Sequence, residues 1–191
     1  MKTLSLHRLR EQFHPDFDAI FDAARPLPTD AAVDSVYLQN HGGLVFIFRD
    51  GINFRTKLFN INALTFEYLC GLATICYHHF VLLGVYQPAS QALSSMFYDE
   101  LSAVFERLAT YNFPVIICGD FNIHVDQVED VNAVLMDQLL QSFGYVQHLS
   151  EPTHNAGHIL DLVITRSDVV VTNLFVGARY LTMHLFASIT V

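Results

Sequence analysis

The sequence predicts an α/β domain in which helices lie outside packed sheets. Of its 191 residues, 52% are hydrophobic and 15% are charged. About 25% of residues are charged in typical globular domains, so much of this chain is expected to be buried. Apolar segments of strand type outnumber amphipathic segments of helix type. The two types do not alternate regularly along the chain, which favours helices that cover packed sheets.

The first thirty residues differ from the rest of the chain. Apolar side chains recur at helical spacing between Phe13 and Ala24, which predicts a short amphipathic helix. Two prolines within residues 25–30 end this pattern. We therefore predict an N-terminal helical extension of residues 1–30 and a domain of residues 31–191. His and Arg interrupt the start of the extension, so it lacks the apolar core of a secretory signal.

The predicted domain begins with a pair of strands. Residues 42–48 contain a glycine pair followed by an apolar run, and residues 52–59 alternate apolar and polar side chains. The Arg-Asp-Gly of residues 49–51 is typical of a turn between two strands. We therefore expect a hairpin in this part of the chain.

Two longer apolar runs follow, at residues 66–76 and 80–86, and His78 and His79 lie between them. Residues 69–86 form the one possible membrane span of the sequence. A span would place both histidines in lipid, which is energetically expensive. We therefore favour two short core strands that pair antiparallel across a polar Tyr-His-His turn.

Two amphipathic helices are predicted next, at residues 93–108 and 131–143. Further strands are predicted at residues 114–118, 157–165, 168–176 and 184–191. The side chains expected to face the core are Leu93, Phe97, Leu101, Val104, Phe105 and Leu108 in the first helix, and Val131, Val134, Leu135 and Leu139 in the second.

Polar side chains lie beside apolar runs in four of these segments. They are Tyr86, Asp120, Asn122, Asp161 and His184. Each has a structural explanation of its own, since Asp shapes an Asx turn, Asn caps a loop, a strand Asp pairs in the core and a single His is usually structural. Together, however, their order along the chain resembles that of a known family.

The segments GVYQP, ICGDFNIHVD and EPTHNAGHILDLVIT resemble the endonuclease/exonuclease/phosphatase superfamily in order and spacing. The chain most resembles the endonuclease domain of LINE-type, non-LTR retrotransposons, and GGLVFIFRDGINF matches the segment that this family places before its tyrosine strand. The resemblance covers residues 31–191. It implies a four-layer α/β/β/α sandwich, with two packed mixed sheets and helices outside, and phosphodiester cleavage with a divalent metal, magnesium or manganese.

The resemblance also implies roles for the five polar residues. Asp120 would orient or deprotonate the attacking water and contact the metal ion. Asn122 would hydrogen-bond the phosphate and hold Asp120, and Tyr86 would donate its hydroxyl to a phosphate oxygen. His184 would bind the oxygen that gains charge, with Asp161 fixing its ring. Donors held in this way stabilise a developing oxyanion, and a metal ion acts as a Lewis acid.

DNA is the substrate that the resemblance implies. The formal net charge of −9 gives no support for binding by bulk charge. Arg49, Arg55 and Lys57 lie in one predicted hairpin and are candidate phosphate contacts, with a solvated strand face as the alternative. Thr153 is expected to turn the chain before a strand and is a further candidate phosphate contact.

Two pairs of side chains near these motifs are open to a metal role. His124 and Asp126 form an HxD pair after the GDFN motif, and we favour a loop that packs against the motif, because two ligands specify little. His154 and His158 could imitate a zinc pair, but no Cys or third ligand accompanies them.

The sequence departs from the family pattern in three places. No segment of residues 1–30 matches the family's first strand, which ends in an Asn that supports the metal. No ETW-like motif supplies the metal-binding Glu, since Glu11 and Glu67 lie in other contexts. Met183 replaces Asp before His184, and a thioether does not bind a hard cation. The alternatives are therefore an impaired endonuclease, a catalytically inactive remnant that binds a partner, and a phosphatase or phospholipid phosphodiesterase of the same superfamily.

Cysteine usage indicates the compartment. The sequence contains three cysteines, which is an odd number: Cys70, Cys76 and Cys118. All three lie in apolar runs, and none belongs to a CxxC motif. This pattern argues against a disulfide framework and against a disulfide-linked partner. Free thiols are typical of a reducing compartment, so we expect an intracellular protein of the nucleus or cytoplasm that is not inserted in a membrane.

Overall fold

The structure, a computed structural model, describes residues 19–21, 44, 46–48, 52–56, 59–75, 77–176 and 185–190. Its central sheet consists of β3 (Asn53–Thr56), β4 (Glu67–Ile75), β5 (His78–Tyr86), β6 (Val115–Asp120), β7 (Tyr145–Gln147) and β8 (Asp161–Arg166). The strand order is β3-β4-β5-β6-β8-β7. Neighbouring strands are antiparallel except for β5 and β6, which are parallel. A parallel pair needs a crossover connection, which helix α3 (Ser95–Ala109) provides.

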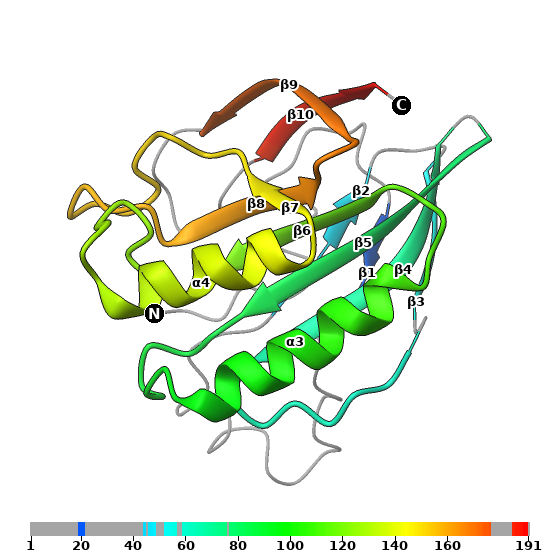
Figure 1. The fold of residues 1–191 in the computed structure, drawn as a ribbon. Coiled ribbons are helices and arrows are strands. Elements are labelled where there is room, and N and C mark those ends of the chain that lie inside the picture. Colours follow the sequence, from blue (N-terminus) through cyan, green and yellow to red (C-terminus); the bar gives the residue numbers. More distant parts are fainter. Residues whose placement is uncertain are drawn as a thin grey trace, which may run out of the picture.

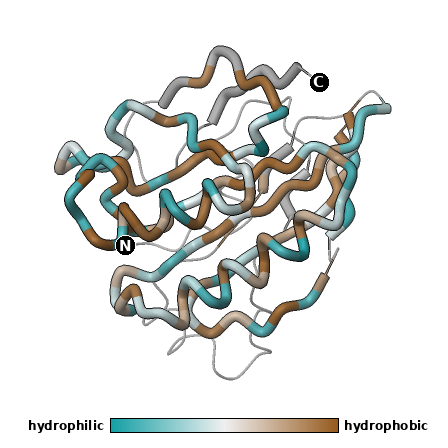
Figure 2. Tube along the Cα trace, in the orientation of Figure 1, coloured by the Kyte–Doolittle hydropathy of each residue, from teal (hydrophilic) through white to brown (hydrophobic). Residues whose placement is uncertain are grey.

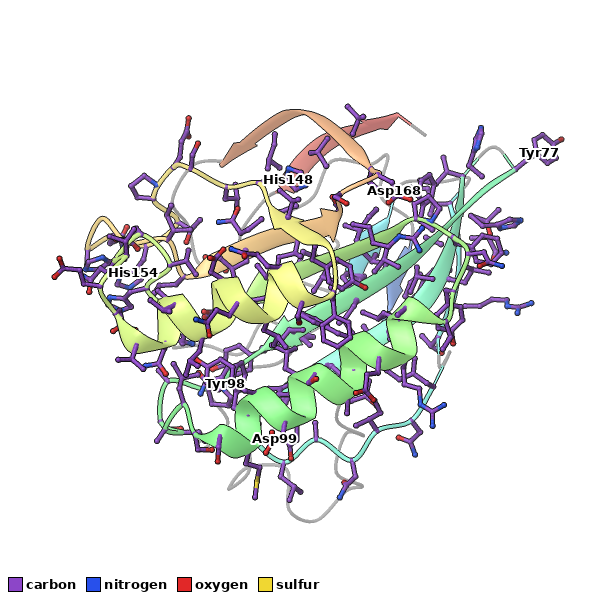
Figure 3. All side chains as sticks on the ribbon, in the orientation of Figure 1. Tyr77, Tyr98, Asp99, His148, His154 and Asp168 are labelled. Atoms are coloured by element: carbon purple, nitrogen blue, oxygen red, sulfur yellow. The ribbon has the colours of Figure 1, made fainter. Side chains whose placement is uncertain are left out.

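The two longer apolar runs form the antiparallel pair β4–β5, which confirms the prediction of paired core strands. The two strands pair along their whole length, from Glu67 opposite Tyr86 to Ile75 opposite His78. Tyr77 turns the hairpin with a φ of 72°, and Figure 3 shows it at the outer tip of this hairpin. His78 and His79, predicted to belong to the turn, instead begin β5. Among the described residues, no helix has both the length and the apolarity that crossing a membrane requires.

Helices α3 and α4 (Val131–Ser142) cover the same face of the sheet (Figure 1). Five of the six residues of the predicted stripe are buried in α3, whereas Leu93 precedes the helix and is partly buried. Complete burial of a Leu or Phe side chain contributes about 1.5–3 kcal/mol. In Figure 2 the central strands are brown over most of their length, whereas α3 changes between brown and teal from one side to the other. This interface is formed by Phe97, Leu101, Val104, Phe105 and Leu108 of α3 and by Val81, Leu83, Val85, Val115 and Ile117 of the sheet.

The core-facing side of α4 differs from the prediction. The apolar spacing predicts that Val131, Val134 and Leu135 face the core, but these side chains are 70%, 41% and 40% exposed. The helix is apolar on two adjacent sides, and spacing alone does not decide which side meets the sheet. The side chains that it buries are Ala133, Met136 and Leu140.

Two antiparallel strand pairs accompany the central sheet. They are β1 (Ala19–Phe21) with β2 (Phe46–Phe48), and β9 (Val170–Val176) with β10 (Leu185–Thr190). The predicted hairpin of residues 42–48 and 52–59 is therefore wrong, because β2 pairs with β1, whereas β3 pairs with β4 in the central sheet. A local turn signal does not determine which strand each of the two segments pairs with. Phe46 lies on the sheet face away from the helices, because its ring approaches Gly84, whose neighbours Leu83 and Val85 face α3. The layers are therefore helices, the six-stranded sheet and β1–β2, as expected for the predicted α/β architecture with packed sheets.

The helix predicted between Phe13 and Ala24 is wrong for Ala19–Phe21, which form β1. This strand pairs with β2, from Ala19 opposite Phe48 to Phe21 opposite Phe46. Pairing with a distant strand is a tertiary contact, and it overrides the local spacing that favoured a helix. The rest of the predicted extension lies outside the described residues.

Candidate functional site

Three of the five polar residues lie side by side at one end of the sheet. Tyr86 ends β5, Asp120 ends β6 and Asp161 begins β8; Tyr86 lies opposite Asp120, and Asp120 lies opposite Asp161. Residues that lie opposite one another project from the same face of a sheet. Glu67 lies opposite Tyr86 and extends this line to β4. We call the line of Glu67, Tyr86, Asp120 and Asp161 the polar row.

The polar row lies on the sheet face away from the helices. Successive side chains of a strand project from opposite faces. Val85 faces α3, so Tyr86 projects from the other face, where Phe46 of β2 approaches Gly84. Figure 1 shows the ends of β5 and β6 and the start of β8 at the same end of the sheet, next to the loops that precede α4 and β8.

The GDFN turn after β6 holds the Asp120 carboxylate in place. Gly119 has a φ of 142°, and a Cβ there would lie 1.9 Å from the Val85 carbonyl oxygen, so only glycine fits. Asn122 has a left-handed φ of 49°, and its backbone N–H donates to Asp120 Oδ1 at 3.0 Å. Its side-chain amide donates to the Gln87 carbonyl at 2.6 Å. An Asx turn is therefore present, and it ties the ends of β5 and β6 together.

The start of β8 is held by the loop that precedes it. Thr153 Oγ1 accepts hydrogen bonds from the N–H groups of Leu160 and Asp161, both at 3.0 Å. The Phe121 N–H donates to the Leu160 carbonyl at 3.0 Å, which links the GDFN turn to this loop. Thr153 therefore positions the backbone of Asp161 beside the end of β6.

The HxD pair packs against the loop before β8, whereas the sequence predicts that it packs against the GDFN motif. Asp126 Oδ2 lies 3.0 Å from His158 Nδ1, and Asp126 Oδ1 accepts from the Ile159 N–H at 2.9 Å. The His124 ring stacks on the His158 ring with centroids 4.3 Å apart. His154 lies in the same loop, at the edge of the molecule (Figure 3), and its Nδ1 accepts a backbone N–H of that loop at 3.2 Å. These side chains fold the loop.

Burial and like charge shift the acidities in the polar row. Burial raises the pKa of the Asp120 carboxyl to about 6, and the nearby Asp161 carboxylate also raises it. Burial likewise raises the pKa of Asp161. The pKa of the Tyr86 hydroxyl is raised by burial and then by the charges of Asp120 and Glu67. At neutral pH, Asp120 is therefore a carboxylate able to accept a proton, and Tyr86 keeps its proton as a donor.

The other candidate residues are not brought to the row by the described part of the chain. Arg55 is exposed on β3 and pairs with Leu72, whereas the row crosses β4 at Glu67. The predicted residues that lie outside the described part are His184, Met183, Arg49 and Lys57.

Sequence motifs do not indicate Glu67, which belongs to the row, or His154, whose charge acts on it. Glu67 belongs to no motif, and only the register of the β4–β5 hairpin places it opposite Tyr86. His154 was considered for zinc alone, yet its charge lowers the pKa of both Asp120 and Asp161. Counting residues from the hairpin turn could have placed Glu67 opposite Tyr86. No sequence pattern indicates the conformation of the loop that contains His154.

A hard cation would find part of a site here. Carboxylate oxygens are the ligands that magnesium prefers, and Asp120 and Asp161 present two of them on adjacent strands. Within the described part of the chain, no group of three His, Cys, Asp or Glu side chains is arranged to hold a metal ion. Asp120 and Asp161 therefore provide part of a cation site, and the described residues do not supply a third ligand.

A family comparison gives this geometry a context. The profile of the Endonuclease/Exonuclease/phosphatase family matches residues 10–184, and thus begins within the predicted extension. Enzymes of that family generally depend on a divalent metal. No curated protein matches the sequence.

Solved structures share the fold at low sequence identity. The human Nocturnin catalytic domain with bound sulfate is 15% identical with a TM-score of 0.60, over 97% of this chain and 76% of that chain. D. rerio TDP2 complexed with single strand DNA product is 10% identical with a TM-score of 0.57, over 94% and 76%. A mannosyl-6-phosphatase of Bacteroides thetaiotaomicron is 11% identical with a TM-score of 0.51, over 75% and 66%. Such identities show the fold and not the substrate.

Proposed function

This chain belongs to the Endonuclease/Exonuclease/phosphatase family, and from this premise we propose that it is a metal-dependent phosphodiesterase. The observation that supports the proposal is the polar row, in which three strands bring Tyr86, Asp120 and Asp161 into one line. A hydroxyl donor beside a carboxylate that accepts protons near neutral pH suits the hydrolysis of a phosphate ester.

In the proposed reaction, Asp120 takes a proton from the attacking water. A base with a pKa of about 6 is ionised at neutral pH and still accepts a proton. Asn122 keeps this carboxylate in place through its backbone N–H, and Tyr86 donates its hydroxyl to a phosphate oxygen. His184 stabilises the oxygen that gains charge, and Asp161 orients the His184 ring.

Magnesium or manganese is the proposed cation, and it would act as a Lewis acid on the phosphate. Asp120 and Asp161 are the residues that would bind it, as the carboxylates on adjacent strands. A further ligand would have to come from outside the described residues or from a change in side-chain position.

DNA is the proposed substrate, and a LINE-type retrotransposon endonuclease is the proposed origin. The succession of GDFN and PTHNAGHILDLVIT supports this branch of the family, and one structure of the same fold is a complex with a single strand DNA product. Thr153, Arg49, Arg55 and Lys57 are the proposed phosphate contacts. The nucleus or cytoplasm is the proposed location, where Cys70 and Cys118 remain free thiols.

A nicking assay tests this function. Purified protein with supercoiled plasmid and magnesium should produce nicked circles, and Asp120→Ala should lower the rate by at least about a thousandfold, because it removes the base. Asp99→Asn is a matched control, since Asp99 is an exposed carboxylate on α3 (Figure 3). Nicking by Asp120→Ala at the wild-type rate would reject the proposal. Inositol phosphates and sphingomyelin, assayed in parallel, would identify a phosphatase or a phospholipid phosphodiesterase instead.

A catalytically inactive binding module is the second candidate function. It is favoured by one observation, namely that the described residues contain no three-ligand metal group. Calorimetry with manganese separates the two candidates. Millimolar or tighter binding that is lost in Asp120→Ala supports the enzyme, and no binding by the wild-type protein supports the inactive module.

A further inference from the structure

Helix α4 has an apolar side that the fold leaves exposed. Val131, Val134 and Leu135 project from this side, and Val128 lies in the preceding turn. We call these four residues the α4 patch. Apolar side chains that are exposed together, rather than singly, mark interaction sites. The patch lies on the helix side of the sheet, whereas the polar row lies on the opposite face, so the two surfaces are separate.

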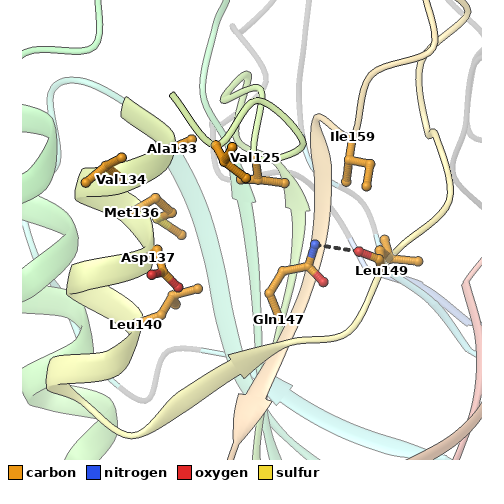
Figure 4. A pocket seen from close by; sticks show the side chains of 10 residues that line it. Val125, Ala133, Val134, Met136, Asp137, Leu140, Gln147, Leu149 and Ile159 are labelled. Carbon is orange, nitrogen blue, oxygen red and sulfur yellow. Dashed lines mark hydrogen bonds between the residues drawn. The ribbon is translucent and has the colours of Figure 1, made fainter. Parts of the chain in front are cut away.

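A cavity of about 440 Å³ opens beside the α4 patch (Figure 4). Val128 and Val134 line this cavity, so the patch and the cavity form one continuous surface. The volume falls within the roughly 300–1,000 Å³ that is usual for ligand pockets. The apolar part of the wall is completed by Val125, Ala133, Met136, Leu140, Leu149 and Ile159.

Gln147 gives the cavity a polar group that needs a partner. Its Nε2 donates to the Leu149 carbonyl at 2.8 Å (Figure 4). Its Oε1 is buried and has no hydrogen-bond partner among the described residues. A buried acceptor without a donor costs about 1–3 kcal/mol. An N–H group that entered the cavity could remove this cost.

The surface around the cavity is acidic. Asp137 is exposed and lines the cavity, and Glu129 is exposed next to Val128 of the patch. Between Arg107 and Arg166 the sequence contains no Lys or Arg, and Arg166 donates to the Tyr111 carbonyl at 3.0 Å. An apolar cavity with an acidic rim is complementary to apolar anchors flanked by basic residues.

We propose that the α4 patch and its cavity are a docking surface for a basic amphipathic helix of another protein, which inserts a tryptophan beside Gln147. An indole is large and apolar and carries one N–H, which is the donor that Gln147 Oε1 lacks. A helix that docks in a groove presents anchors on one face, which suits a surface along α4. A second copy docking through the same patch would bring Glu129 and Asp137 near their counterparts, and like charge disfavours that arrangement.

The absence of tryptophan from this protein makes the test direct. The probe is a synthetic Lys/Leu helical peptide of about 18 residues with one Trp on its apolar face. When it binds the full chain, its Trp emission should shift to shorter wavelength. Val134→Glu should weaken binding by about tenfold. Calorimetry, which needs no Trp signal, compares this peptide with one in which Phe replaces Trp. The exchange should weaken binding by about fivefold for the wild-type protein and by clearly less for Gln147→Leu, because that variant lacks the acceptor.

Leu64→Glu is the matched control, because Leu64 is an exposed apolar residue outside α4 and the change of charge is the same. This variant should bind the peptide like the wild-type protein, and circular dichroism should show that both variants are folded. A scrambled peptide of the same composition measures attraction by charge alone. Equal binding of the ordered and scrambled peptides, or of wild type and Val134→Glu, would overturn the proposal. A dimer that dissociates in Val134→Glu would also overturn it, since the surface would then belong to a second copy.

Discussion

The two faces of the central sheet are built from the same strands and do different things. In β5, Leu83 and Val85 pack against the helices, whereas Gly84 and Tyr86 belong to the opposite face. The face covered by the helices carries closely packed apolar side chains. The opposite face carries the polar row at one end of the sheet. Successive side chains of a strand project from opposite faces of the sheet, so a single strand contributes one residue to the core and the next to the face that carries the polar row.

The faces also differ in what specifies them. A packed face tolerates exchanges among apolar side chains of similar volume. The polar row depends on register, since a slip by one residue would move each of its side chains to the other face. We therefore expect truncations on the helix face to lower the free energy of unfolding. Substitutions in the row should change binding and catalysis, and those that remove a buried charge should raise the free energy of unfolding. Three predictions test this separation.

The largest effect on stability is expected on the helix face. Leu101 of α3 is completely buried, and Leu101→Ala should lower the free energy of unfolding by about 3 kcal/mol, because it leaves a cavity among rigid neighbours. Urea unfolding followed by circular dichroism measures this loss. Met96→Ala, on the exposed side of the same helix, should change it by less than about 0.5 kcal/mol. If Leu101→Ala lowered nicking per folded molecule, the two faces would not be separable.

The sequence predicted the parts of the fold that single segments determine. The stripe of α3 has one apolar side, so its spacing identified the buried residues, and the pair β4–β5 followed from two apolar runs around one turn. The strands found as β2, β6, β8, β9 and β10 were likewise indicated by local apolar runs, and β3 was indicated by alternation of apolar and polar side chains. The positions of Asp120 and Asn122 after β6 could be predicted from the GDFN motif, because the Gly119 conformation and the hydrogen bond of the Asx turn are local features.

The remainder depended on contacts between distant segments. Strand β1 requires β2, and β7 has only three residues at the edge of the sheet. The rotation of α4 could not be predicted from two adjacent apolar sides. Glu67 joins the polar row only through the hairpin register, and no motif around it in the sequence indicates this position. Sequence motifs identified Tyr86, Asp120 and Asp161, which lie at strand ends. Only the pairing of β4 with β5 identified Glu67.

Substitution of Asp120 in the polar row is expected to raise the free energy of unfolding, by less than Leu101→Ala lowers it. Asp120 has a pKa of about 6 in the folded state and about 4 when unfolded. Between these values the folded state holds a proton that the unfolded state has lost, so the free energy of unfolding falls as the pH rises through this window and stays low above it. Asp120→Asn removes this fall and should raise the free energy of unfolding at pH 7 by about 1–2 kcal/mol, with allowance for solvent screening.

Urea unfolding in EDTA at about pH 7 and about pH 3.5 measures the difference, because the wild-type carboxyl is protonated in both states at the lower pH. The gain should be absent at the lower pH. Asp99→Asn, which changes an exposed carboxylate, should show no such dependence. A gain of equal size at both pH values would show that Asn simply packs better, and the burial of the Asp120 charge would not be the cause.

The smallest effect is expected at Glu67, and it decides what this residue does in the row. Its charge contributes to the raised pKa of the Tyr86 hydroxyl, so it also opposes an anion bound to that hydroxyl. Glu67→Gln should therefore tighten the inhibition of nicking by inorganic phosphate by about two- to fivefold, because it removes a nearby like charge that solvent partly screens. Glu106→Gln, an exposed position on α3, should leave the inhibition constant unchanged. If Glu67→Gln instead weakened manganese binding in calorimetry, Glu67 would be a cation ligand. The polar row would then contain the carboxylate that the family motif lacks, and its four residues would act as one site across four strands.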